Sequence, residues 1–151
     1  MRRLPIWSVL AIAILFVSCT MPSSRESFCR RPLSDGSYRF TMEFADSAAS
    51  YDLYLCTCFD CRDEQMVSTG TLPLEIRAVS PDGHVYGEKV YFPLNEPIRA
   101  TYNTKEYICL YRSGLSGSGI WQLSLTPTEP WRLSKGCRGF GIQMRVSNGE
   151  R

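Results

Sequence analysis

The stretch Tyr38-Arg39-Phe40-Thr41-Met42-Glu43-Phe44 alternates strictly between large apolar side chains and polar ones. Because successive side chains of a β-strand point to opposite faces, the pattern puts four apolar side chains on one face of a strand. The same period of two recurs along the chain, at residues 51–55, 72–78, 85–92, 107–112, 121–125 and 140–146. Beyond the first 18 residues, no segment keeps a helical period of 3.6 for more than about two turns.

Turn signals separate these stretches. Ser80-Pro81-Asp82-Gly83 is typical of a hairpin turn, because proline presets φ and glycine accepts a positive φ. The loop of residues 114–119 contains three glycines. Seven or eight short strands joined in this way predict an all-β domain over residues 37–148, an antiparallel β-sandwich of jelly-roll or immunoglobulin-like type.

The start of the chain has the layout of an export signal. Met1-Arg2-Arg3 is cationic, residues 4–17 are almost wholly apolar, and Ser18 is a small residue directly before Cys19. The apolar stretch is too short to span a bilayer comfortably, so residues 1–18 are predicted to be a signal peptide. Residues 19–36 are polar and lack apolar periodicity, which is typical of a tether.

The four residues Phe16-Val17-Ser18-Cys19 resemble the lipobox of bacterial lipoproteins, except that Phe16 stands where leucine is usual. The resemblance implies that Cys19 receives a diacylglycerol, that the chain is cleaved before it, and that its new amino group is acylated. Acyl chains of this kind suffice for stable membrane anchoring. The alternative is an ordinary signal peptide followed by an unmodified Cys19.

Charge limits the partners. Once Arg2 and Arg3 leave with the signal peptide, 15 basic and 15 acidic residues remain. A nucleic acid or an anionic membrane surface would require a basic excess, so neither is expected to bind the domain itself. The glycine-rich loop of residues 114–119 enters a strand rather than a helix, so it lacks the helix N-terminus that collects phosphate. The sequence predicts no cofactor.

Six cysteines remain when Cys19 is set aside: Cys29, Cys56, Cys58, Cys61, Cys109 and Cys137. An even number in an exported chain indicates up to three disulfides, in any of 15 connectivities. The cluster Cys56-x-Cys58-x-x-Cys61 also allows a zinc site completed by His84 or Cys109, or a redox-active thiol. Disulfides are the prediction, because exported thiols tend to be oxidised and the spacing is not a paired Cys-x-x-Cys motif.

Residues for catalysis are scarce. His84 is the only histidine, and its place directly after the Pro-Asp-Gly turn favours a solvated loop residue. A Ser-His-Asp arrangement would have to use it, yet Ser80 and Asp82 lie in the same turn, where such geometry rarely forms. Glu43, Asp52 and Glu75 occupy outward positions on ordinary strands rather than a shared cleft. The sequence therefore predicts a protein that is not an enzyme.

The order of the strand motifs resembles the GldH-type gliding-motility lipoproteins of Bacteroidetes. The segments that carry the resemblance are Phe44 with Tyr51-Asp52-Leu53-Tyr54-Leu55, Leu72-Pro73-Leu74-Glu75-Ile76 with Ser80-Pro81-Asp82-Gly83, Gly119-Ile120-Trp121-Gln122-Leu123-Ser124-Leu125, and Gly139-Phe140-Gly141-Ile142-Gln143-Met144. The chain departs from that family at residues 56–61, where three cysteines replace a polar and aromatic segment. The resemblance implies a cell-envelope lipoprotein with no enzymatic activity.

We therefore expect a lipid-anchored interaction or scaffold module that contacts another envelope protein, with gliding motility or its secretion machinery as the implied setting. Residues 20–24 contain no acidic run, and by resemblance to lipoproteins of this phylum that favours the periplasmic face of the outer membrane. The alternative is a surface lipoprotein that binds carbohydrate through aromatic side chains. Trp131, in a turn-rich loop, is the aromatic most expected at such a binding surface.

Overall fold

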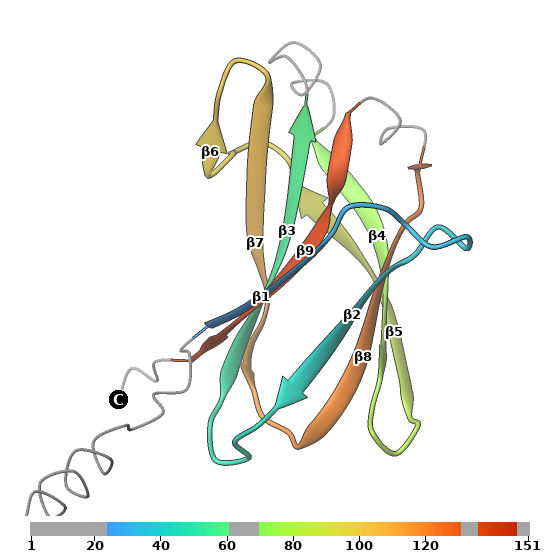
Figure 1. Ribbon diagram of the computed structural model, residues 1–151, viewed down its shortest axis with the longest axis vertical. Helices are drawn as coiled ribbons and strands as arrows, with labels where there is room; N and C mark the ends of the chain where they lie inside the picture. The colour runs from blue at the N-terminus through green and yellow to red at the C-terminus, as the bar shows by residue number, and fades with distance from the viewer. Residues whose placement is uncertain (1–23, 61–69, 131–135, 148–151) are drawn as a thin grey trace, which may run out of the picture.

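The computed structural model describes residues 24–60, 70–130 and 136–147. These residues form nine strands and no helix (Figure 1). The strands are β1 (Ser24–Cys29), β2 (Tyr38–Phe44), β3 (Tyr51–Asp60), β4 (Thr71–Val79), β5 (Val85–Pro93), β6 (Arg99–Ala100), β7 (Thr104–Leu115), β8 (Gly119–Pro127) and β9 (Cys137–Val146). In this part of the chain, no helix has the length and apolarity that crossing a membrane requires.

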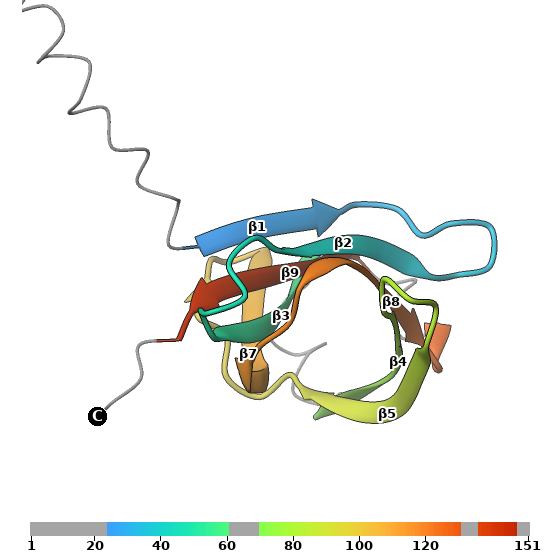
Figure 2. The ribbon, with the colours of Figure 1, turned by 90° about the horizontal axis from the view of Figure 1, so that it is seen from below.

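The strands form two antiparallel sheets. Sheet A has the order β1-β9-β3-β7-β6 and sheet B the order β2-β8-β4-β5. Seen from below, the sheets curve around a common interior, with β1 and β2 on one side and β5 on the opposite side (Figure 2). The predicted antiparallel β-sandwich is confirmed, with nine strands rather than seven or eight.

The additional strands are at the edges of sheet A. Residues 24–29, expected to belong to the tether, form β1 and pair with β9 from Ser24 opposite Arg145 to Cys29 opposite Phe140. Backbone hydrogen bonds to β9 order this polar segment, which explains why its side chains show no apolar pattern. The two-residue β6 pairs with Lys105 and Glu106 at the other edge. Sheet A therefore includes residues 24–29, which lie ahead of the predicted domain of residues 37–148.

The inward faces of the two sheets make one apolar core. In β2 every second residue is buried, as the alternation in the sequence predicts. Leu72, Leu74 and Ile76 repeat the pattern in β4, where they are at most 2% exposed. Aromatic rings join the sheets, since Tyr38 of β2 meets Phe140 of β9 edge-on with 4.9 Å between ring centroids. Burial of these side chains is the main force that holds the sheets together.

Candidate functional site

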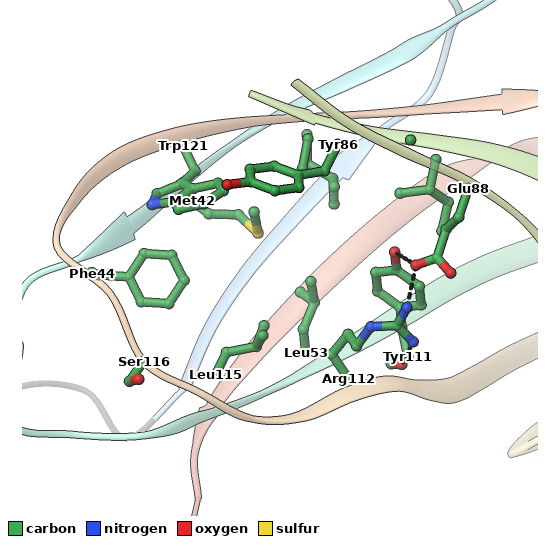
Figure 3. A pocket seen from close by; sticks show the side chains of 14 residues that line it. Met42, Phe44, Leu53, Tyr86, Glu88, Tyr111, Arg112, Leu115, Ser116 and Trp121 are labelled. Carbon is green, nitrogen blue, oxygen red and sulfur yellow. Dashed lines mark hydrogen bonds and ion pairs between the residues drawn. The ribbon is translucent and has the colours of Figure 1, made fainter. Parts of the chain in front are cut away.

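A cleft of about 470 Å³ opens between the two sheets at the side of the sandwich formed by β5 and β7 (Figure 3). Six strands contribute to its wall, and most of the side chains are apolar. The lining residues are Met42, Phe44, Leu53, Ile76, Ala78, Tyr86, Gly87, Glu88, Tyr111, Arg112, Leu115, Ser116, Trp121 and Leu123. Clefts of this size and character are where proteins commonly hold small ligands.

The register of sheet B leaves room for the cleft. Ala78 of β4 lies opposite Tyr86 of β5 on one side and Leu123 of β8 on the other. Side chains at directly opposed positions share a face of the sheet. The small methyl side chain of Ala78 therefore lies between the large side chains of Tyr86 and Leu123. Sheet B does not fill the space over this methyl group.

Two aromatic rings form one wall. Tyr86 and Trp121 are stacked, with centroids 5.9 Å apart and an angle of 28° between their planes. Tyr86 is 57% exposed, so its ring lies at the mouth. The indole nitrogen of Trp121 is on the side of the ring toward Phe44 in Figure 3, is buried, and has no hydrogen-bond partner among the described residues.

A polar cluster closes the opposite end. Glu88 stands on the inner face of β5, opposite Ile76, where the alternation of the strand would otherwise place an apolar side chain. Its Oε1 accepts hydrogen bonds from the Tyr111 hydroxyl and from Nη2 of Arg112, both on β7. Because β5 and β7 belong to different sheets, this cluster links the two layers across the cleft.

A β-bulge brings both β7 side chains to Glu88. Leu53 and Tyr54 are neighbours on β3, but their partners on β7 are Arg112 and Leu110, so Tyr111 is an extra residue. Such a bulge changes the direction of side chains next to it. The guanidinium of Arg112 also lies over the Tyr111 ring, 4.6 Å from its centroid.

The cluster fixes its own protonation states. The hydrogen bond from Tyr111 lowers the pKa of Glu88, and Arg112 lowers it further. Burial raises the pKa of Tyr111, and the hydrogen bond to Glu88 raises it again. At neutral pH the carboxyl is therefore ionised and the phenol keeps its proton, so the charges of Glu88 and Arg112 compensate each other.

We expect the variant Glu88→Gln to unfold at a lower temperature than the unmodified chain at neutral pH, by a margin that corresponds to about 1 kcal/mol or less. The effect is small because the side chains of Glu88 and Arg112 are 38% and 49% exposed. A lowered folded-state pKa stabilises the fold above the ordinary value of 4.5, and this contribution is lost as the pH falls below it. Thermal unfolding at a series of pH values should show the two curves converging in acid. A constant difference at all pH values would contradict the ion pair.

The outer face of sheet A carries two thiols. Cys56 and Cys58 lie on β3 beside Ile108 and Arg138, in a second hollow of the surface. Burial raises the pKa of Cys56 to about 11, and burial followed by Glu106 raises that of Cys58. Both thiols therefore stay protonated at neutral pH, which disfavours nucleophilic chemistry because the thiolate is the reactive form.

The structure joins none of the five described cysteines to another, and the predicted disulfides stay a prediction. Free thiols are found at Cys29, Cys56, Cys58, Cys109 and Cys137. The register supplies the reason, because none of these faces another cysteine across the sheet. Cys29 pairs with Phe140, Cys56 with Ile108 and Gly141, Cys58 with Glu106 and Gly139, Cys109 with Leu55, and Cys137 with Phe59. A disulfide to Cys61 stays a prediction, since Cys61 is outside the described residues, as are Cys19 and Trp131.

Among the described residues, the zinc ligands considered from the sequence are on different faces or different sheets. Cys56 is on the outer face of sheet A, whereas Cys109 packs against the core on its inner face. His84 lies at the turn between β4 and β5 of the other sheet. Within residues 24–60, 70–130 and 136–147, no three side chains of ligand type form a group able to hold a metal ion.

The turn before β5 does not have the geometry of a hydrolase. The Ser80 hydroxyl donates to the Asp82 carboxylate, and His84 Nε2 lies 3.3 Å from the other oxygen of Asp82. The carboxylate therefore stands between hydroxyl and imidazole, whereas a triad needs the imidazole to take the hydroxyl proton. Ser80 Oγ instead accepts the backbone N–H of His84 at 3.0 Å, which closes the turn.

The carboxylates considered for glycoside hydrolysis are also apart. Glu43 forms an ion pair with Arg25 at 2.8 Å on the exterior. Asp52 accepts hydrogen bonds from the Ser113 hydroxyl and the Gly114 backbone, at 2.7 and 3.0 Å. Glu75 is exposed on the outer face of β4. None of the three lines the cleft.

No family model matches the chain, and no curated protein matches it either. Among solved structures, the enzymatically active domain of tailspike protein 4 from bacteriophage CBA120 is similar with a TM-score of 0.30 and 11% sequence identity. The similarity covers 81% of this chain and 17% of the tailspike chain. At this TM-score the likeness supports no statement about function.

Proposed function

We propose that this protein is a non-enzymatic lipoprotein of the cell envelope, anchored through lipid on Cys19, whose β-sandwich acts as an interaction module. The observation that carries the binding role is the cleft between the sheets. Its wall is largely apolar, and its two charged side chains, Glu88 and Arg112, are bonded to each other, with Tyr111 donating a hydrogen bond to Glu88. Such a site offers contact area rather than a poised acid, base or nucleophile.

The sequence supports the envelope setting. A cationic start, an apolar stretch and the Ser18-Cys19 junction favour export and lipidation, and the balance of charge favours anchoring by acyl chains over binding to anionic lipid. A protein partner in the envelope, on the periplasmic face of the outer membrane, fits a short anchored module. The resemblance to gliding-motility lipoproteins suggests the process that such a module serves.

Carbohydrate binding is the second candidate. It is favoured by Tyr86, whose ring is 57% exposed at the mouth of the cleft and backed by Trp121. An exposed ring stacked on a second one presents a flat apolar surface of the kind that sugars stack on.

Crosslinking in cells tests the anchored module. We expect a tagged chain to recover a defined set of envelope proteins, and the Cys19→Ala variant to lose both the membrane association and that set. The lipid attachment keeps the domain at the surface where its partner resides, so its loss dilutes the domain away from the partner. Mass spectrometry of the crosslinked material identifies the set. Recovery of the same proteins with Cys19→Ala, or of none with the unmodified chain, would contradict the proposal.

A further inference from the structure

The cleft is apolar along its length and polar at one end. Phe44 and Ser116 lie at one end in Figure 3, Leu53 and Leu115 between, and Glu88 with Arg112 at the other. This distribution describes the molecule that would fill the cleft. Its middle part must be apolar where it contacts Leu53 and Leu115, and charged side chains meet it only at Glu88 and Arg112.

Water is a poor occupant for most of this space. A water molecule held in a protein usually makes about three hydrogen bonds, and side chains such as Leu53, Leu115 and Leu123 offer none. An unfilled gap is also unfavourable, because the side chains around it lose the dispersion contacts of a close-packed interior. An apolar chain would restore those contacts.

The polar end favours a group without net charge. The carboxylate of Glu88 and the guanidinium of Arg112 form an ion pair, so together they present no excess charge to an ionic head. Both hydrogen bonds to Glu88 reach Oε1, and in the described part of the chain no donor reaches Oε2. Oε2 can therefore accept a hydrogen bond from a neutral hydroxyl.

We propose that the cleft holds the acyl chain of an uncharged single-chain lipid, with its hydroxyl-bearing head at Glu88 and Arg112. This inference rests on the proposed function, because it names the ligand of the same cleft. An oligosaccharide fits less well, because it would need many hydrogen bonds. The lining supplies polar side-chain groups only at Glu88, Tyr111, Arg112, Ser116 and the edges of Tyr86 and Trp121.

The test uses the chain with Cys19→Ser, purified without detergent, so that neither an anchor nor a detergent occupies the cleft. The probe is N-phenyl-1-naphthylamine, a neutral apolar dye that becomes fluorescent in apolar surroundings, and dodecanol is the competitor. We expect saturable fluorescence that dodecanol displaces, with dodecanoate and maltoheptaose weaker competitors.

Matched variants locate the site. Ala78→Phe fills the cleft from the middle of β4 and should weaken dye binding about tenfold or more, a loss of about 1.4 kcal/mol. Val79→Phe adds the same ring to the opposite face of the strand and should leave binding unchanged. If Ala78→Phe unfolds, as circular dichroism would reveal, Ser116→Phe at the exposed end of the cleft replaces it, with Ser118→Phe as its control.

Equal binding by Ala78→Phe and Val79→Phe, or displacement by maltoheptaose in preference to dodecanol, would overturn the lipid assignment. These outcomes are separate from those of the crosslinking experiment. If the Cys19→Ser chain bound no dye while the unmodified tagged chain recovered envelope proteins, only the ligand assignment would be refuted. Dye binding as expected, together with recovery of no envelope protein by the unmodified tagged chain, would refute only the anchored module.

Discussion

Phe140→Ala is expected to lower the free energy of unfolding by about 3–5 kcal/mol, the range for truncating a fully buried phenylalanine. Phe140 is 0% exposed on β9, which lies between β1 and β3, and it stands opposite Cys29 and Thr57. Its ring also meets Tyr38 of the other sheet edge-on. The substitution therefore removes contacts within sheet A and between the sheets, and leaves a cavity. Equilibrium unfolding in urea measures the loss.

Phe28→Ala is the matched control. Phe28 lies on β1, opposite Gly141, and is 48% exposed on the outer face of sheet A. Truncating a ring that is half in solvent should cost about 1 kcal/mol or less. If both variants lost the same stability, the inward position of Phe140 would be wrong.

The sequence predicted the interior strands because their side chains face two environments. Residues 38–44 alternate, and every second one is buried as expected. β1 was not predicted, because backbone hydrogen bonds to one neighbouring strand can order an edge strand. Such bonds do not require apolar and polar side chains to alternate. The segment Ser24–Cys29 therefore had the composition of a tether while forming part of the sheet.

The candidate site was predictable only in part. Tyr86, Tyr111 and Trp121 lie in stretches that were predicted to be strands, and all three line the cleft. The pairing of Glu88 with Arg112 was missed, because it depends on the extra residue at Tyr111 that shifts the register of β7. A signal was present, since Glu88 interrupts the inward series of Tyr86, Val90 and Phe92, and an inward carboxylate needs a partner.

The cysteines illustrate the limit of counting. An even number of cysteines predicts pairing without regard to where each side chain points. Cys56 and Cys109 lie on adjacent strands, yet one is on the outer face of sheet A and the other on the inner face. Pairing requires a register and a shared face, and neither is determined by the spacing of cysteines along the chain.

Gly139→Ala is expected to destabilise the protein by about 2–4 kcal/mol and to release β1 from the sheet. Gly139 has a φ of +132°, which is strained for any residue with a side chain. A Cβ atom here would lie 2.1 Å from the carbonyl oxygen of Cys29 and 2.9 Å from Cα of Arg30. Both atoms belong to the backbone at the end of β1, so no side-chain rotation relieves the overlap and the strand itself must move.

Gly83→Ala is the control for backbone strain: it shows how much of the stability lost in Gly139→Ala comes from the positive φ alone. Gly83 has a φ of +90° in the turn before β5, but a Cβ atom there would meet nothing within 4 Å. Its substitution should cost about 1 kcal/mol and leave β1 intact. Hydrogen exchange measures the difference directly, because the amides of β1 should exchange faster in Gly139→Ala than in Gly83→Ala. Equal protection of β1 in both variants would mean that contact with Gly139 does not hold β1 on the sheet. In that case the backbone hydrogen bonds between β1 and β9 would be enough to hold β1 on the sheet, although its side chains resemble those of a tether.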